Sequence, residues 1–153
     1  MDIYAYATAI GSPDSRIHSG PQTLLDACMP LPVSCHIQHP LTISTTVTGK
    51  EAIVPAAHLN NQLATLTRES VLQSHYFLTL SANHTGAIGT WSGAMAALQQ
   101  QNQAGGLIWI DAHMDSHTFA TSISQHLYGM PLAILLGYGE DKLTQIASPK
   151  PAL

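Results

Sequence analysis

The chain has 153 residues, of which 45% are hydrophobic, and this is enough for one domain with a substantial core. The charged fraction is only 9%, against ~25% in typical soluble domains. A surface rich in Gln, Ser and Thr accounts for some of this deficit, and we expect part of the remaining surface to be covered by a partner or by the rest of a larger domain. The net charge of −4, with only 5 Lys and Arg residues, excludes a basic patch for nucleic acid or an anionic membrane surface.

No membrane segment or leader is indicated, because every apolar run is far shorter than the ~20 residues of a membrane helix and residues 1–4 lack a basic region. Cys28 and Cys35 match no zinc or redox spacing, so two reduced thiols are expected. These features favour a cytoplasmic protein.

The first part of the chain is predicted to form short elements separated by Pro and Gly. In order, we expect a strand within residues 3–10, a loop over 11–22, helical turns over 22–28, and short strands at Val33–Ile37 and Leu41–Val47.

The second part has stronger periodic patterns. Apolar residues at helical spacing predict a helix over 56–74, and a compact apolar run predicts a buried parallel strand at His75–Leu80. There follow a helix over 86–101 ended by Gly105-Gly106, a second buried strand at Leu107–Ile110, a Ser/Thr-rich loop over 115–128, a short apolar helix over 130–136, and a frayed end beyond Glu140.

The alternation of strand and helix over 75–137 predicts an α/β fold with a parallel sheet flanked by helices. With a right-handed crossover, the strands at 75–80 and 107–110 would be parallel neighbours. Ligands in such sheets bind at the carboxyl ends of the strands, where the polar residues of interest occur.

Asp111, His113 and Asp115 occupy alternate positions just after the second strand, and His84 follows the first one. Alternate side chains of extended chain share a side, so two carboxylates and an imidazole are expected to converge, with His84 reaching them from the next strand. This donor set suits Mn, Fe, Co or Zn, and the absence of thiolate disfavours a structural zinc. The competing interpretation is a polar loop whose pattern arose by chance, and spacing alone does not separate the two.

The stretch Leu107–Thr118, which contains Asp-Ala-His-Met-Asp, resembles the central D-A-H-x-D motif of the arginase and agmatinase (ureohydrolase) family. Ser81–Thr90 is similar to the family's G-G-D-H-S motif, Tyr128–Leu132 to its H-G-x-P segment, and Ser19-Gly20-Pro21 to an early G-P element. The resemblance is strongest over residues 76–137. It implies a three-layer α/β/α domain over 1–153 with the C-terminal part missing.

The resemblance also implies a site with two manganese ions that hydrolyses guanidino or other linear amidine compounds such as arginine, agmatine or formiminoglutamate. His84 and Asp115 would bind the first ion, His113 the second, and Asp111 both, with Asp111 and His113 acting as catalytic residues. By the same alignment, Ser124 and His126 would contact the amino-acid end of the substrate.

Three departures from the family pattern bear on activity. The family's later D-x-D motif, which supplies two more ligands, has no counterpart in the 153 residues, so four of six ligand positions remain and the second metal is expected to be weak or absent. Asn83 replaces the family's acidic residue, which removes a carboxylate that orients a ligand histidine. Tyr128 replaces a histidine that shuttles protons in arginases.

Three interpretations remain open from the sequence. The chain is a manganese-dependent amidine hydrolase completed by another chain; or a non-catalytic truncated paralogue that binds at most one metal or acts as an interaction subunit; or an unrelated metal-binding α/β module. Association into a homo-oligomer or with a complementing chain is expected, because a half-domain would expose apolar sheet edge and have marginal solubility. His117 is either a support for the ligands or a solvated loop residue.

Overall fold

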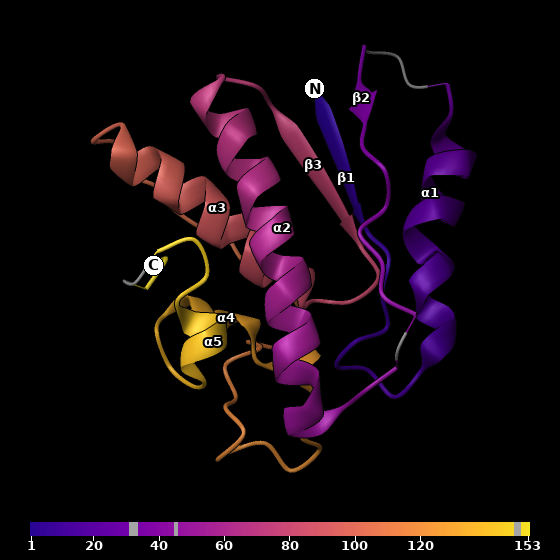
Figure 1. Cartoon of the computed structure of the whole chain (residues 1–153), viewed down its shortest axis with the longest axis vertical. Helices are drawn as coiled ribbons and strands as arrows, with labels where there is room; N and C mark the ends of the chain where they lie inside the picture. The colour runs from indigo at the N-terminus through magenta and orange to yellow at the C-terminus, as the bar shows by residue number, and fades with distance from the viewer. Residues whose placement is uncertain (31–33, 45, 149–150) are drawn as a thin grey trace.

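The computed structural model describes residues 1–30, 34–44, 46–148 and 151–153. A parallel sheet in the order β2-β1-β3 forms its centre, with β1 at Asp2–Tyr6, β2 at His36–Ile37 and β3 at Phe77–Ser81. Figure 1 shows α1 (Gly20–Cys28) and α2 (Ile53–Leu72) on opposite sides of the strands, with α3 (Gly86–Gln100) beside α2. The predicted α/β class, with helices flanking a parallel sheet, is confirmed.

The central strand β1 is buried on both faces, as a strand between two helical layers must be. Tyr4 and Tyr6 pack into the main core together with α2, and alternation therefore places Ile3 and Ala5 on the side of α1. Burial raises the pKa of Tyr6 to about 12, so its hydroxyl stays neutral and donates or accepts hydrogen bonds in the core.

Helix α2 buries one stripe of side chains at helical spacing. Its buried residues are Ala56, Ala57, Leu59, Asn60, Leu63, Ala64, Thr67 and Ser70. Asn60 is polar but satisfied: its Nδ2 donates to Tyr6 Oη at 3.2 Å and to the Ala56 carbonyl at 2.9 Å, and its Oδ1 accepts from the Gly89 amide at 2.7 Å. This side chain therefore links α2, β1 and α3.

Helix α3 packs very closely on α2 and on the end of the sheet because three of its positions are glycine. A Cβ at Gly93 would lie 2.1 Å from the Ala64 carbonyl oxygen, and one at Gly89 would lie 2.5 Å from that of Asn60. A Cβ at Gly86 would lie 2.4 Å from Ser81 Oγ. The small residues thus fix the position of α3 against both elements.

The predictions for the first part of the chain are confirmed only in outline. The first strand is β1 and ends at Tyr6, the loop over 11–22 contains a 3-10 helix (η1, Ser15–Ser19), and α1 begins earlier than the predicted turns. The strand predicted at Val33–Ile37 is reduced to β2, and Val33 itself lies outside the described residues. The strand predicted at Leu41–Val47 is wrong for its described part: Leu41 forms one bridge with Tyr6 and no strand follows.

The two long helices are predicted well, since α2 (after a 3-10 turn, η2, Gly49–Ala52) and α3 match 56–74 and 86–101 closely. The strand at His75–Leu80 appears as β3, but its side chains are half-buried or exposed rather than buried. It is an edge strand, and its neighbour is β1.

The second buried strand predicted at Leu107–Ile110 is wrong in this structure. The segment is not assigned to any strand, and Ile108 and Ile110 are 84% and 94% exposed. The predicted pairing of this segment with the strand at 75–80 is therefore also wrong. Its sequence has the composition of a buried strand, but no described segment lies alongside to pair with it.

The C-terminal part is more ordered than predicted. After the 115–128 loop come a 3-10 turn (η3, Leu127–Gly129), α4 (Pro131–Leu135) and α5 (Asp141–Thr144). Leu143 and Ile146 are buried in the main core, so the expected fraying beyond Glu140 is wrong up to that point. Across the described ranges, no helix is long and apolar enough to cross a membrane.

At the amino end of the sheet, the carboxylate of Asp2 joins three elements. Asp2 Oδ2 accepts from Ser70 Oγ at 2.7 Å and lies 3.1 Å from His75 Nδ1, and Oδ1 lies 3.4 Å from His36 Nδ1. The Ser70 bond holds the pKa of Asp2 below its ordinary value, against the opposing effect of burial. The charged carboxylate thus ties β1 to α2 and to the residues that begin β2 and precede β3.

We expect Gly93→Ala to lower the free energy of unfolding by about 1–3 kcal/mol or more, because the new methyl group meets main chain that cannot move independently. This exceeds the ~1 kcal/mol gained from the higher helix propensity of Ala. Gly20→Ala is the matched control, since Gly20 has a helical φ of −54° and nothing lies within 4 Å of its Cβ position. Urea unfolding followed by circular dichroism would measure both, and equal stability of the two variants would contradict the close packing.

We expect part of the acid destabilisation of the fold to come from Asp2. Its pKa is lower in the folded than in the unfolded chain, so its stabilising effect is complete above the unfolded value near ~3.9 and is lost as pH falls through the folded value. Urea midpoints measured from pH 6 to 2.5 should therefore fall less steeply for Asp2→Asn than for the parent chain. Ser70→Ala, which removes the largest cause of the pKa shift, should give an intermediate slope. If the parent chain and both variants showed the same slope, the acid destabilisation would not come from Asp2.

Candidate metal centre

Two carboxylates and one imidazole converge at the carboxyl end of β3, and we call His84, Asp111 and Asp115 the metal trio. One ligand atom from each lies within 4.8 Å of the others, and no other such group occurs among the described residues. His84 Nδ1 lies 2.6 Å from Asp115 Oδ2 and 3.2 Å from Asp111 Oδ2. As expected, the histidine that follows the first strand approaches the acidic residues that follow Ile110.

His84 is placed by the connection between β3 and α3, and Asn83 holds this connection in position. Asn83 Nδ2 donates to the carbonyls of Ile10 at 3.1 Å and Thr8 at 3.4 Å, in the segment that follows β1. Its Oδ1 accepts from the Thr85 amide at 2.9 Å and from the Thr85 hydroxyl. Because an amide N–H can only donate, the Thr85 contact fixes which end of the Asn83 side chain is the oxygen.

Asp115 is placed by a tight turn and by the start of α4. Its φ of 49° lies in the left-handed region, which Asp tolerates better than most residues. Its carbonyl accepts from the Leu132 amide at 3.0 Å and the Ala133 amide at 3.4 Å, which are free donors in the first turn of α4. The side chain is consequently directed at His84 with only 6% exposure.

The two carboxylates of the trio are in different electrostatic environments. Burial raises the pKa of Asp115, although the His84 hydrogen bond acts in the opposite direction. The His113 amide donates to Asp111 Oδ1 at 2.8 Å, and this bond, with the nearby imidazoles, lowers the pKa of Asp111. Burying one carboxylate beside another is unfavourable unless positive charge compensates it, and His84 Nδ1 contacts both carboxylates.

His113 is not part of the trio, although its imidazole lies beside Asp111. Its Nδ1 lies 3.5 Å from Asp111 Oδ1, and its side chain is 83% exposed. The chain bends at residues 111–113 instead of continuing as extended strand, so the alternation rule does not apply. The imidazole remains beside Asp111 and open to solvent.

Ser124 and His126 lie together in the following loop. The His126 amide donates to Ser124 Oγ at 3.4 Å, and His126 Nδ1 lies 3.1 Å from Tyr128 Oη, with the two rings 5.3 Å apart. Their expected contact with substrate stays a prediction. His117 Nδ1 lies 3.2 Å from Thr121 Oγ1 and its amide donates to the Gly129 carbonyl at 3.3 Å, so His117 contributes to the structure of this loop.

The donor set of the trio fits a divalent cation that accepts oxygen and nitrogen ligands, manganese included. A cation among these three atoms would neutralise the buried Asp115 together with Asp111. The ligand roles of His84, Asp111, His113 and Asp115 stay predictions.

The sequence interpretation missed the positioning role of Asn83, which it treated as the loss of a useful carboxylate. The signal was present: an Asn three residues before the helix start can accept from the main-chain amide at i+2, as Asn83 does from Thr85. The sequence pattern did not predict that Asn83 also contacts the main-chain carbonyls that follow β1, because this contact depends on tertiary structure.

Comparison with known proteins gives a consistent result. Residues 4–149 match the Arginase family. The arginase of Bacillus caldovelox is 38% identical over 97 residues, which cover 63% of this chain and 31% of that one. The mitochondrial arginase-2 of Rattus norvegicus is 29% identical over 154 residues, covering 90% of this chain and 42% of the relative.

The fold agrees with the same family. The native structure of Bacillus caldovelox arginase superposes with a TM-score of 0.84 at 28% identity, covering 99% of this chain and 54% of that one. The structure of Bacillus subtilis arginase, at 23% identity and a TM-score of 0.82, shows the same fold over 52% of its length. This chain therefore spans about half the length of the solved structures it matches, and less than half of the curated relatives.

We expect Asn83→Asp, which restores the family's acidic residue, to lower the free energy of unfolding by about 1–3 kcal/mol, because a carboxylate cannot donate to the carbonyls of Thr8 and Ile10. Asn102→Asp adds the same charge at an exposed position and is the control. Thermal melts at pH 7 would compare them. An Asn83→Asp variant as stable as the control would show that these bonds do not hold the connection.

Proposed function

The chain belongs to the arginase family, and from this premise we propose that it is a manganese-dependent hydrolase of guanidino or other linear amidine compounds whose activity as a 153-residue chain is impaired. The observation that carries the proposal is the convergence of His84, Asp111 and Asp115 within 4.8 Å at the carboxyl end of β3. The resemblance to the family's G-G-D-H-S and D-A-H-x-D motifs implies that these residues correspond to its ligand positions.

His84, Asp111 and Asp115 are the residues that would hold manganese. When bound, the metal supplies Lewis acidity that activates water and stabilises the negative charge developing on the substrate during hydrolysis. The protein's own contribution is to orient the ligands: the His113 amide fixes Asp111 Oδ1, and the left-handed turn at Asp115 directs its carboxylate inward. Ligands fixed in this way lose little freedom on binding a cation.

His113 is the proposed ligand for a second ion and, with Asp111, the proposed catalytic residue. Its exposed imidazole lies beside Asp111 and has room to bind a cation. Only Asp111 and His113 are available to that second ion, which is why we expect it to bind weakly. Ser124 and His126 are proposed to contact the amino-acid end of the substrate, and Tyr128, which contacts His126, replaces the family's proton-shuttling histidine.

A second candidate function follows from the same geometry. Three ligand atoms converge, while the exposed imidazole of His113 lies beside Asp111 and outside this group, and this arrangement suits one metal better than two. A non-catalytic family member that binds at most one ion, or that serves as an interaction subunit, is therefore the alternative. Metal stoichiometry and urea release separate these functions.

We expect the purified chain, stripped with chelator and titrated calorimetrically with Mn²⁺, to bind at least one ion per chain. Asp115→Asn and His84→Ala should each weaken binding at least about tenfold, because each removes a converging ligand. Asp26→Asn and His58→Ala, which change the same residue types at exposed positions elsewhere, should bind like the parent chain. Urea release from arginine and agmatine should then be compared between the parent chain, Asp111→Ala and His113→Ala.

Each outcome decides between the candidates. Two ions per chain and urea release that is lost in Asp111→Ala and His113→Ala would support the hydrolase. One ion with equal urea release in all three proteins would support the non-catalytic alternative. No Mn²⁺ binding at millimolar concentration would eliminate both metal-dependent functions.

A further inference from the structure

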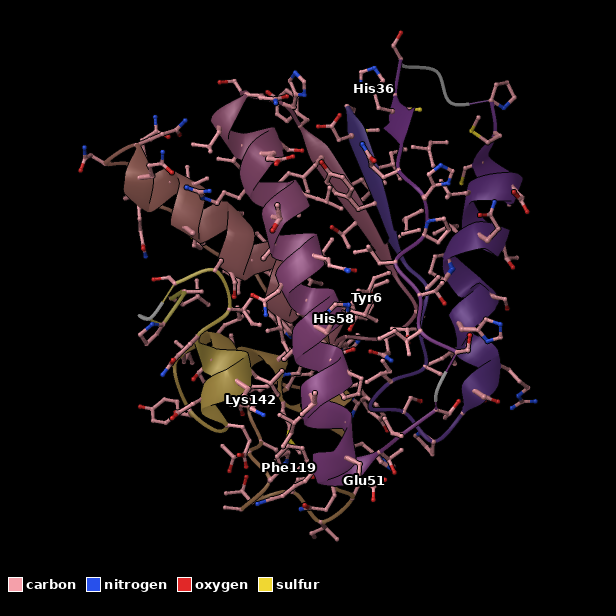
Figure 2. The ribbon with its side chains drawn as sticks, viewed as in Figure 1. Tyr6, His36, Glu51, His58, Phe119 and Lys142 are labelled. Atoms are coloured by element: carbon pink, nitrogen blue, oxygen red, sulfur yellow. The ribbon has the colours of Figure 1, made fainter. Side chains whose placement is uncertain are left out.

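Two imidazoles flank one carboxylate at the amino end of the sheet, and we call Asp2, His36 and His75 the amino-end cluster. His75 Nδ1 lies 3.1 Å from Asp2 Oδ2, and His36 Nδ1 lies 3.4 Å from Asp2 Oδ1. Figure 2 shows His36 where β1 and β2 begin, and Phe119 of the 115–128 loop beyond the opposite end of the sheet. The cluster is therefore separate from the metal trio, which lies at the carboxyl end of β3.

No permanent cation compensates the carboxylate of this cluster. The Asp2 side chain is only 11% exposed, and the hydrogen bond from Ser70 holds its pKa below the ordinary value, so the group is charged at neutral pH. Its side-chain partners among the described residues are two imidazoles and one hydroxyl, with no Lys or Arg. A largely buried negative charge is costly without a positive charge beside it, so this environment favours a bound cation.

The donor set of the cluster suits zinc. Zn²⁺ binds imidazole nitrogen and carboxylate oxygen, and an open zinc site has three such protein ligands with water in the fourth position. Two ligand atoms on one tetrahedral Zn²⁺ ion are about 3.3 Å apart, given the usual bond lengths. The two nitrogen–oxygen distances of 3.1 and 3.4 Å are close to this value. With two imidazoles and one carboxylate, the cluster suits Zn²⁺ better than Mn²⁺, which prefers oxygen ligands.

Both imidazoles can present Nδ1 to a cation while remaining neutral. In the metal-free chain the Nδ1 of His75 carries a hydrogen, because a carboxylate oxygen can only accept. When Nδ1 binds a cation, the hydrogen of the neutral ring is carried by Nε2. The two Nε2 atoms have no hydrogen-bond partner within the described part of the chain, and the side chains are 79% exposed at His36 and 44% exposed at His75. Water can therefore solvate the relocated hydrogens.

A chain of hydroxyl groups fixes the carboxylate from the buried side. Ser70 Oγ donates to Asp2 Oδ2 at 2.7 Å, and Tyr4 Oη lies 2.6 Å from Ser70 Oγ and 3.1 Å from the Leu66 carbonyl. The single hydrogen of the Ser70 hydroxyl goes to the carboxylate, so the Tyr4 hydroxyl is the donor to Ser70. Metal-binding carboxylates are commonly held in this way by further hydrogen bonds.

The cluster is open in this structure, because its imidazoles contact different oxygens of the carboxylate. The ligand atoms of the three residues do not all lie within 4.8 Å of one another, as those of the metal trio do. His36 can close the cluster, since its ring is bonded to Asp2 alone among the described residues and its side chain is exposed. We propose that the amino-end cluster binds one Zn²⁺ ion through the Asp2 carboxylate and the Nδ1 atoms of His36 and His75.

The role of this ion is structural. Asp2 belongs to β1, His36 to β2, and His75 lies two residues before β3, so a shared cation joins all three strands of the sheet at their amino ends. A ligand that binds only the folded chain stabilises it in proportion to its saturation. The site does not depend on the proposed function, because no residue of the metal trio takes part in it.

The test is a calorimetric titration with Zn²⁺ at neutral pH, after removal of metal with chelator. The host is the full chain with His84→Ala and Asp115→Asn, which disables the metal trio. We expect one Zn²⁺ ion per host chain and a higher urea midpoint when Zn²⁺ is present. His36→Gln and His75→Gln should each weaken binding at least about tenfold and abolish the rise in the midpoint. His39→Gln, which removes an exposed imidazole three residues after His36, is the matched control and should change neither.

A second measurement uses the unaltered chain, and so remains valid if the host does not fold. Co²⁺ has ligand preferences close to those of Zn²⁺ and is paramagnetic, so it broadens the amide signals of nearby residues in NMR spectra. Broadening at Ile3 and Ile37 reports the amino-end cluster, whereas broadening at Gly86 and Ala87 reports the metal trio. His36→Gln should abolish the first effect and leave the second. Failure of this proposal is thereby distinguishable from failure of the proposed function.

Three results would overturn the proposal. The first is the absence of Zn²⁺ binding to the folded host at millimolar concentration, and the second is the absence of Co²⁺ broadening at Ile3 and Ile37 in the unaltered chain. The third is a loss of Zn²⁺ affinity in His39→Gln as large as that in His36→Gln and His75→Gln, which would identify the binding as adventitious association with surface histidines.

Discussion

The close approach of α3 to α2 is the constraint on which the rest of the structure depends. Main-chain carbonyls of α2 occupy the space where side chains at Gly89 and Gly93 would lie, so α3 has one position and cannot shift along its neighbour. Gly86 fixes the first turn of α3 against Ser81 in the same way. His84 lies just before this turn, and the segment that carries Asp111 and Asp115 follows α3 after residues 101–106, so the positions of all three depend on α3.

The trio is tied to the C-terminal core through Asp115. Its carboxylate contacts His84, and its carbonyl accepts from the first amides of α4, so the same residue joins the site to a helix whose Ile134 packs in the main core. Asn83 has the equivalent role beside His84, because it joins the β3–α3 connection to the chain after β1. Both loops that hold ligands are therefore fixed by main-chain contacts with residues far away in the sequence.

The features predicted from sequence are those that local patterns determine. Helices α2 and α3 follow from apolar and small residues at helical spacing. His84 meets Asp111 and Asp115 as expected, although Leu107–Ile110, the second strand on which that expectation rested, is not assigned to a strand. The orientation of His113 was not predictable, because a bend at 111–113 replaces the extended chain that the alternation rule assumes. The burial of Leu107–Ile110 was wrongly predicted for a different reason. Composition indicates the environment for which a segment is suited, but burial requires packing neighbours, and the described residues do not cover Ile108 and Ile110.

The metal trio joins two segments that are far apart in the sequence. His84 belongs to the connection between β3 and α3, and Asp111 and Asp115 belong to the segment that follows Ile110. A cation held by all three would restrict the separation of these two segments, and any contact that already restricts it would strengthen cation binding by an equal factor. Asn83 and the carbonyl of Asp115 make such contacts, so the fixed positions of the two loops and the affinity for metal are expected to depend on each other.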